Sequence, residues 1–167
     1  MFDELTVVDI QKMQQELDYR TGELRQQIHE DIIHAKEFGD LSENAEYREA
    51  RRAKGRNESR ITYLQDMIRT AKIIEPNPDK DVVGIFDSVD ILFEIDGEIE
   101  TMTISTTLRR DAGNGIISNQ SPLGKAVFGK RLGDRCFVEL ENGSGYYVQI
   151  RGIKKGKDDD SLPIAKF

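Results

Sequence analysis

The first half of the chain carries its apolar residues at helical spacing. Between residues 9 and 71 there is no proline, and the apolar positions recur at steps that favour one face of a helix. The pattern predicts two amphipathic helices of about 28 residues each, which would pair as an antiparallel hairpin roughly 40 Å long at 1.5 Å per residue. The apolar positions are Ile10, Met13, Leu17, Leu24, Ile28, Ile32 and Ala35, then Ala50, Ala53, Ile61, Leu64, Ile68 and Ala71.

The series of apolar positions at helical spacing, which we call the apolar stripe, is interrupted at residues 38–43. Gly39 favours the left-handed conformation that ends many helices. Asp40, followed three residues later by Glu43, is typical of an acidic capping box, which begins a helix. We therefore expect the two helices to be joined by a tight turn with an acidic tip.

The second half has a strand-like pattern instead. Asp96-Gly97 and Asn142-Gly143 are typical hairpin turns, and Pro122 and Gly129 bracket a short helix at residues 121–129. This pattern predicts a small α+β domain, mostly antiparallel sheet with one short helix. Segments rich in β-branched and aromatic residues are 82–86, 89–95, 100–104, 136–140 and 146–150.

These patterns divide the chain into four parts. Residues 1–75 form the hairpin with its acidic tip, and residues 76–81, which include Pro76 and Pro78, form a linker because neither proline continues a helix easily. Residues 82–154 form the second domain. Residues 155–167 are a polar tail, which we expect to be loose until its last residues.

Composition excludes several classes of protein. No run approaches the roughly 18 apolar residues of a membrane helix, and the first residues lack a secretory signal, so we expect no membrane contact and a cytoplasmic location. A single cysteine and two histidines exclude an internal disulfide and a Cys/His zinc cluster. A net charge of −7 lacks the basic footprint of a protein that binds duplex nucleic acid unaided.

Two motifs carry a resemblance to a known family. Residues 39–47 read Gly-Asp-Leu-Ser-Glu-Asn-Ala-Glu-Tyr, and residues 117–118 lead into Ser-Pro-Leu-Gly-Lys-Ala at 121–126. Both resemble the signatures of the bacterial transcript-cleavage factors, the GreA/GreB family, and are most like GreA. Glu16 with Leu17, and Arg60 with Ile61, also stand where that family has such pairs. The resemblance implies a coiled-coil hairpin followed by an FKBP-like domain.

The resemblance also implies a function. Factors of this family insert the hairpin into the secondary channel of RNA polymerase and stimulate cleavage of backtracked RNA. The protein would therefore not be an enzyme itself, and its tip would act inside the active site of the polymerase. Asp40 and Glu43 would be its catalytic residues, with no cofactor of its own and a Mg²⁺ shared with polymerase. The alternatives are that these carboxylates only cap a helix, or that the factor occupies the channel and inhibits polymerase without cleavage.

Two further groups of residues are candidates for partner contacts. Arg48, Arg52 and Arg56 follow one another at four-residue spacing; they form either a solvated face paired with Glu49 or the family's basic patch, which contacts the backtracked RNA 3′ segment through phosphates. Ser121, Pro122, Leu123 and Gly124 lie in the domain that, by resemblance, docks onto polymerase, although the same residues would also start a helix. We expect a monomer.

The chain departs from the family pattern at three places. Asp9 replaces a glycine common in the opening helix, and residues 105–111 lack the acidic residues usual there. The chain also runs past the customary end with Gly-Lys-Asp-Asp-Asp at 156–160.

Overall fold

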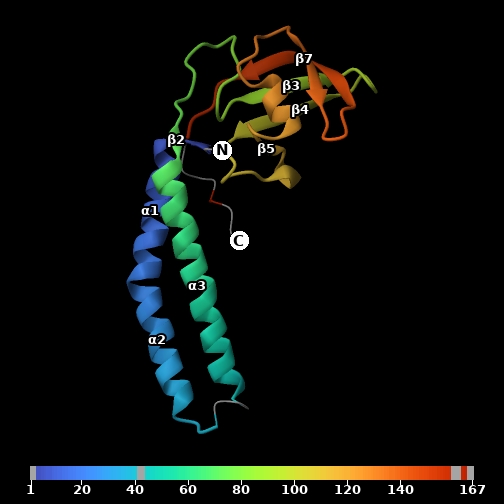
Figure 1. Cartoon of the computed structure of the whole chain (residues 1–167). Coiled ribbons are helices and arrows are strands. Elements are labelled where there is room, and N and C mark those ends of the chain that lie inside the picture. The colour runs from blue at the N-terminus through green and yellow to red at the C-terminus, as the bar shows by residue number, and fades with distance from the viewer. Residues whose placement is uncertain (1–2, 41–43, 159–162, 165–167) are drawn as a thin grey trace. The chain divides into compact units, whose positions relative to one another are not determined.

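A computed structural model of the chain describes residues 3–40, 44–158 and 163–164. The described chain divides into two units (Figure 1). One consists mainly of residues 10–71, and the other combines residues 3–9 with residues 72–166. The N-terminal segment 3–9, which the sequence pattern placed with the hairpin, therefore lies with the second unit.

The first unit is the predicted helical hairpin. Helix α1 spans Val7–Thr21, α2 spans Glu23–Lys36 and α3 spans Ala45–Thr70. The apolar stripe packs between them as expected, and its most buried members are Met13, Ile28, Ala35, Ala50, Ile61 and Leu64. Figure 1 shows α3 running alongside α2 in the opposite direction.

The first long helix is divided at Gly22, which the periodicity did not show. The backbone at Gly22 leaves helical geometry, with φ −99° and ψ −97°, although its N–H still donates to the carbonyl of Asp18 at 3.0 Å. A Cβ at this position would lie 3.1 Å from that same carbonyl oxygen, so glycine relieves a crowded break between α1 and α2.

A polar network joins the two sides of the hairpin. The guanidinium of Arg60 donates to both carboxylate oxygens of Glu16, at 2.9 and 3.0 Å, and Arg20 donates to Glu16 at 2.7 Å. Burial alone would raise the pKa of Glu16, but the hydrogen bonds from Arg60 and Arg20 lower it below its ordinary value. Asn57, which is buried, accepts at Oδ1 from the Arg20 guanidinium and donates from Nδ2 to the backbone carbonyl of Arg20, both at 3.1 Å. Because these hydrogen bonds join side chains of α1 and α3, the network favours one register of the two helices.

The second unit is built on a five-stranded sheet with the order β5-β4-β3-β7-β6. The strands are β3 Ser88–Phe93, β4 Ile99–Ser105, β5 Ile116–Ser118, β6 Arg135–Glu139 and β7 Gly145–Lys154, with helix α4 at Pro122–Val127 and a 3₁₀ turn, η1, at Ala112–Asn114. Both predicted hairpin turns are confirmed, with positive φ at Gly97 and Gly143. The buried core joins one face of the sheet to α4 and includes Val89, Ile91, Ile104, Val127, Val138, Val148 and Ile150.

Three features of this unit differ from the sequence-based expectation. Strand β5 pairs with β4 in parallel, so the sheet is mixed and not wholly antiparallel. Residues 82–86 form no strand beyond an isolated bridge at Val82, because Phe86 adopts a positive φ of 65° that bends the chain. A short parallel pair, β1 at Glu4–Leu5 with β2 at Lys72–Ile73, was not predicted.

The tail is not loose at its start. Lys155 donates from Nζ to the carbonyl of Val82 at 3.0 Å and pairs with Asp87, and the N–H of Gly156 donates to Asp87 at 3.1 Å. The expectation of a loose tail is therefore wrong for residues 155–158, because buried carboxylates and carbonyls of the second unit supply partners that local sequence does not reveal. In the described part of the chain, no helix is long and apolar enough to cross a membrane.

Candidate functional site

The turn between α2 and α3 is the first candidate site. Helix α2 ends at Lys36, and Gly39 follows with φ +98°, as the sequence predicted for a helix-ending glycine. Phe38 is 65% exposed, and its ring meets that of His34 edge-on with 5.2 Å between centroids. Asp40 comes next and is exposed, while Glu43 lies outside the described residues. Of the two residues of the predicted acidic tip, the structure therefore describes only Asp40.

The cap of α3 is not the one that the sequence pattern predicted. Asn44 is the N-cap, and its Oδ1 accepts a hydrogen bond from the N–H of Tyr47 at 3.0 Å. Its Nδ2 donates to the carbonyl of Ala35 at 2.7 Å and so joins the start of α3 to the end of α2. The prediction that Asp40 caps α3 is therefore wrong, because Asn44 lies closer to the helix and supplies both an acceptor and a donor.

The surface beside this turn is hollowed and acidic. A hollow of about 430 Å³ is lined by Phe38, Asp40, Asn44, Ala45 and Glu46. Carboxylate oxygens are ligands that Mg²⁺ accepts, although that ion prefers octahedral coordination and keeps several waters. Within residues 3–40, 44–158 and 163–164, no group of three or more His, Cys, Asp or Glu is placed to hold a metal ion.

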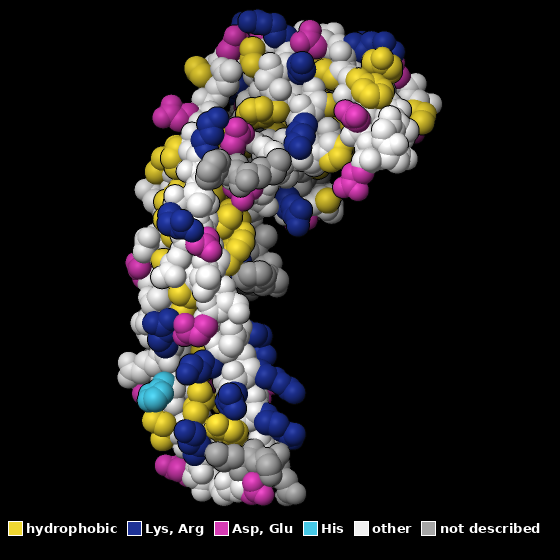
Figure 2. All heavy atoms as spheres, in the orientation of Figure 1, with side chains coloured by type: hydrophobic (Ala, Val, Ile, Leu, Met, Phe, Trp, Pro, Cys, Tyr) yellow, Lys and Arg dark blue, Asp and Glu magenta, His cyan; other side chains and the backbone are white. Residues whose placement is uncertain are grey.

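The three predicted arginines lie exposed on one helix. Arg48, Arg52 and Arg56 all belong to α3, and Figure 2 shows Lys and Arg side chains gathered along this part of the helical hairpin, which we also call the arm. Glu49 accepts from Arg56 at 2.7 Å and lies 4.0 Å from Arg52. The hydrogen bond from Arg56 lowers the pKa of the Glu49 carboxyl below its ordinary value. The helix thus presents a cationic face that one carboxylate partly neutralises.

The Ser121–Gly124 motif has clear structural roles. Ser121 caps α4 by accepting from the N–H of Gly124 at 3.1 Å, and Pro122 occupies the first turn. Gly124 is buried, and a Cβ there would lie 2.0 Å from the carbonyl oxygen of Ser118, so no larger residue fits. Leu123 packs against the hydrophobic core. Of the four predicted contact residues, Pro122 is the exposed one.

Pro122 borders a depression of mixed polar and apolar lining that sequence reasoning missed. The depression has a volume of about 560 Å³ and extends from α4 to strand β6. Phe137 and Leu140, from β6 and the residue after it, contribute apolar surface, and their side chains are 47% and 38% exposed. Burial alternates along β6, with Phe137 on the exposed face, and the fold brings this residue beside Pro122. The remaining lining residues are Gln120, Lys125, Ala126, Glu139 and Glu141.

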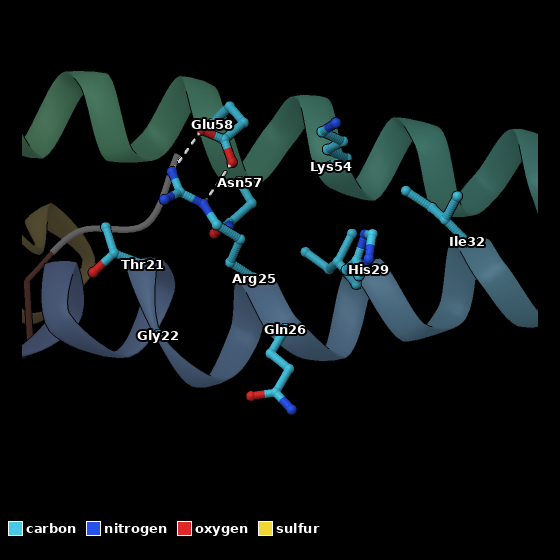
Figure 3. Close-up of a pocket in the computed structure, with 10 residues that line it drawn as sticks. Thr21, Gly22, Arg25, Gln26, His29, Ile32, Lys54, Asn57 and Glu58 are labelled. Atoms are coloured by element: carbon cyan, nitrogen blue, oxygen red, sulfur yellow. Dashed lines mark hydrogen bonds and ion pairs between the residues drawn. The ribbon is translucent and has the colours of Figure 1, made fainter.

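A second feature that the sequence did not reveal is a groove along the arm. It has a volume of about 460 Å³ between α2 and α3, next to the break at Gly22 (Figure 3). Ile28 and Ile32 supply apolar lining, and Arg25 bridges the groove by donating to both carboxylate oxygens of Glu58 at 3.0 and 2.8 Å. The apolar stripe of α2 was predicted from spacing, but the gap beside it depends on the divided helix.

Comparisons with known proteins agree with the two-part architecture. A sequence profile described as "Transcription elongation factor, N-terminal" matches residues 4–73, and one described as "Transcription elongation factor, GreA/GreB, C-term" matches residues 77–155.

Individual relatives match over most of their length. The chain is 40% identical over 150 residues to transcription elongation factor GreA of Staphylococcus carnosus, covering 90% of this chain and 94% of that protein. It is 42% identical over 145 residues to GreA of Geobacillus kaustophilus, covering 86% and 91%. Among solved structures, GreA factor homolog 1 (Gfh1) of Thermus thermophilus is 24% identical, with a TM-score of 0.42 over 92% of this chain and 99% of that one.

Proposed function

Because the chain belongs to the GreA/GreB family of transcription elongation factors, we propose that it stimulates cleavage of backtracked RNA by RNA polymerase. In this proposal the hairpin enters the secondary channel of polymerase, and its tip reaches the polymerase active site. The protein acts as a factor: the bond is cut by the polymerase, and the tip completes the polymerase's own site.

The observation that supports this role most directly is the cap of α3. The hydrogen bonds that begin this helix come from Asn44, so the fold does not require an Asp40 carboxylate at the cap position. Asp40 is exposed at the end of the hairpin and borders an acidic hollow. An exposed carboxylate that is not the N-cap of α3 can contact a ligand outside the chain.

The chemistry of the tip suits a shared metal site. Asp40 and Glu43 offer hard oxygen ligands, and two carboxylates on a turn are too few for an octahedral Mg²⁺ site by themselves. We propose that both residues bind Mg²⁺ only together with polymerase and RNA groups. When bound there, the ion would activate water for phosphodiester hydrolysis. This chain's own part is to hold negative charge at the end of a rigid arm and to orient water by accepting its hydrogen bonds.

The arginine row is proposed to contact the backtracked RNA. Arg48, Arg52 and Arg56 are exposed on α3, the helix that begins at the acidic tip. Arginines at four-residue spacing follow one face of a helix and can bind successive phosphates. Glu49 pairs with two of them in the free protein and would exchange these partners for phosphate oxygens.

The depression beside Pro122 is the proposed docking surface for polymerase. Its apolar lining comes from Pro122, Phe137 and Leu140, and half-exposed apolar side chains in a depression are typical of protein contact sites. Ser121 and Gly124 contribute indirectly, because they position α4 and thereby Pro122.

A transcript-cleavage assay tests the proposal. The protein is added to stalled, backtracked elongation complexes, and RNA labelled at the 5′ end is followed with time. We expect shortening from the 3′ end with the protein and Mg²⁺ present, and no cleavage of free RNA by the protein and Mg²⁺ without polymerase. Cleavage of free RNA would contradict the shared site, and binding without RNA shortening would identify an inhibitory factor instead.

A further inference from the structure

Three charged residues that lie far apart in the sequence meet in space. Asp9 comes from the first turn of α1, Arg109 from the segment after β4, and Asp158 from the tail after β7. All three lie in the second unit, which includes residues 3–9 and 72–166. Nε of Arg109 donates to Asp9 at 2.6 Å, and its two terminal nitrogens donate to the two carboxylate oxygens of Asp158, at 2.6 Å for the Nη2–Oδ2 contact.

This cluster is buried and well hydrogen-bonded. The Arg109 side chain is 1% exposed, and those of Asp9 and Asp158 are 0% and 10% exposed. Thr6 donates from its hydroxyl to Asp158 at 2.8 Å and from its N–H to Asp9 at 3.0 Å. Burial alone would lower the pKa of the Arg109 guanidinium, but its hydrogen bonds to Asp158 and Asp9 raise that pKa above its ordinary value. Arg109 is therefore a permanent cation with two anionic partners.

The path of the tail toward Arg109 is also defined. The N–H of Gly156 donates to Asp87 at 3.1 Å, and a Cβ on Gly156 would lie 1.8 Å from the carbonyl oxygen of Phe86. Only glycine permits the backbone to pass so closely. The Phe86 ring in turn lies 5.0 Å from the guanidinium of Arg109. These contacts fix the backbone at Gly156 and place the carboxylate of Asp158 against the guanidinium of Arg109.

Asp158 is the second carboxylate that contacts Arg109. Arg109 and Asp9 neutralise each other without the tail, and Asp158 adds one further negative charge. Asp158 is held by the bidentate geometry of the guanidinium and by the Thr6 hydroxyl, which is how proteins recognise carboxylates in general.

Besides this contact, residues 3–9 are held by side-chain hydrogen bonds from Asn119 to Glu4 at 3.2 Å and from Thr107 to Asp3 at 3.4 Å, and by a short β pair. Strands β1 and β2 pair over only two residues each, Glu4–Leu5 with Lys72–Ile73, and so short a two-stranded pair is marginal by itself. Nevertheless Leu5 is fully buried and Thr6 is 4% exposed. Helix α1 starts directly after them, at Val7.

We propose that Arg109 and Thr6 form a carboxylate-binding site, that the chain's own Asp158 is its ligand, and that its occupation holds residues 3–9 on the second unit. The tail is then a latch on the segment from which α1 begins. As a consequence that rests on the proposed function, release of the latch lowers the stimulation of RNA cleavage, because the arm helix starts from a loosened segment.

Hydrogen exchange in the full-length Asp158→Ala variant tests the latch. The amide of Thr6 donates to Asp9, and that of Ile74 donates to the carbonyl of Leu5 at 2.9 Å. We expect both amides to exchange faster by about tenfold or more, since a charge-assisted, buried contact is lost. The amide of Ile150, which donates to Asp134, reports on the sheet and keeps its rate. Asp96→Ala, which removes an exposed carboxylate at the β3–β4 turn, is the matched control and leaves the Thr6 and Ile74 rates unchanged.

Chemical rescue separates a binding site from a merely structural contact. Sodium acetate, compared with sodium chloride at equal ionic strength and neutral pH, should slow exchange of the Thr6 and Ile74 amides in Asp158→Ala in a saturable manner. Acetate should have no such effect on the double variant Arg109→Gln, Asp158→Ala. Unchanged exchange in Asp158→Ala would overturn the latch, and identical effects of acetate and chloride would overturn the carboxylate site.

A cleavage assay distinguishes this inference from the proposed function. With saturating protein, Asp158→Ala should support RNA cleavage several-fold more slowly than the wild type, whereas Asp96→Ala should not differ from it. If the wild-type protein failed to stimulate cleavage, the proposed function would fail while the exchange results still decided the latch. If Asp158→Ala showed faster exchange but full cleavage, the functional consequence of the latch would be wrong.

Discussion

At the scale of single residues, the structure separates side chains that hold the fold from side chains that are exposed at the surface. Asn44 and Ser121 each cap a helix, and Gly124 fits against a carbonyl oxygen that excludes any larger residue. Asp40 and Pro122 are exposed neighbours of these residues in the sequence. Residues of one motif therefore divide between structural and proposed functional roles, and substitutions can address them separately.

The tip carboxylate gives the sharpest residue-scale prediction. Asp40→Asn should change the free energy of unfolding by no more than about 1 kcal/mol, because the cap is supplied by Asn44. Stimulated RNA cleavage should fall by roughly a hundredfold or more, because an amide is a poor ligand for Mg²⁺. Thermal melts, polymerase competition and cleavage kinetics measure the three properties.

Asp31→Asn is the matched control for this substitution. Asp31 is an exposed residue of α2 that accepts a side-chain hydrogen bond from Gln27, which asparagine can also accept. It should leave cleavage unchanged. Near-normal cleavage by folded Asp40→Asn would remove Asp40 from the mechanism.

The second residue-scale prediction concerns pH. Hydrogen bonds from Arg135 and Gln149 lower the pKa of Glu94 to about 2. A carboxyl whose pKa is lower in the folded state contributes stability above its unfolded pKa and loses it as the pH falls. This contribution should therefore be complete above roughly pH 4.5 and lost by about pH 2.

An NMR titration of the Glu94 carboxyl carbon measures this shift directly. The midpoint should lie near pH 2 in the wild type and return toward the ordinary value in Arg135→Leu. A wild-type midpoint at the ordinary value would show that the ion pair, with its 2.8 Å contact, is not maintained in solution.

At the scale of elements, local signals and packing acted together. The apolar stripe predicted both sides of the hairpin, but the break at Gly22 and the cap at Asn44 depend on contacts that the stripe does not encode. Glu16 and Arg60, which the family resemblance had already singled out, form an ion pair across the hairpin, with the Arg60 side chain 6% exposed. We interpret Glu16 and Arg60 as structural residues, because their ion pair joins α1 to α3 and favours one register of these helices.

The two hydrogen bonds of Asn44 should be separable by substitution. Asn44→Ala loses both the cap on the Tyr47 N–H and the bond to the Ala35 carbonyl, and should destabilise the hairpin by about 1–2 kcal/mol. Asn44→Ser keeps a good cap but cannot reach Ala35, so its loss should be smaller. Denaturant unfolding gives both values, and equal losses would show that the cap contributes nothing.

The arginine row belongs to the same helix and can be tested by charge reversal. Arg52→Glu with Arg56→Glu should weaken binding to complexes with extruded RNA more than binding to polymerase alone, because phosphate contacts are lost. The dependence of affinity on salt should become less steep for the RNA-containing complex. Competition binding at several salt concentrations measures both effects.

Arg69→Glu reverses a charge at the other end of α3 and is the control. Arg69 pairs with Asp66 at 2.8 Å, much as Arg56 pairs with Glu49. Equal weakening on both kinds of complex by the Arg52/Arg56 variant would indicate a solvated face and not an RNA contact.

At the scale of the whole molecule, the proposal assigns affinity and activity to different units. The depression beside Pro122 belongs to the second unit, and the acidic turn belongs to the first. Changing the depression should lower the affinity for polymerase, and changing the acidic turn should lower the cleavage rate at saturation. The two effects should be independent, because in this proposal each surface contacts a different part of polymerase.

Pro122→Asp should therefore raise the concentration needed for half-maximal RNA cleavage by about tenfold or more, with the rate at saturation unchanged. Aspartate is tolerated in the first turn of a helix, so α4 should persist. Asp40→Asn should have the opposite effect, with a low saturating rate and normal affinity. The control Ile95→Asp charges an apolar side chain that is 80% exposed at the β3–β4 turn and should alter neither value. A reduced saturating rate in Pro122→Asp would contradict the division.

The sequence by itself determined the features that depend on near neighbours along the chain. Helical and strand periodicity, the glycine turns at Gly97 and Gly143, and the start of α4 at Ser121 and Pro122 were all predicted, because each depends on residues within one or two turns. Only the tertiary structure decided the parallel pairing of β5, the irregular path at Phe86, and the attachment of the tail through Arg109, Asp9 and Asp158. These features join residues about 10 to 150 positions apart, and such pairings depend on the packing of the whole unit, which local propensity does not contain.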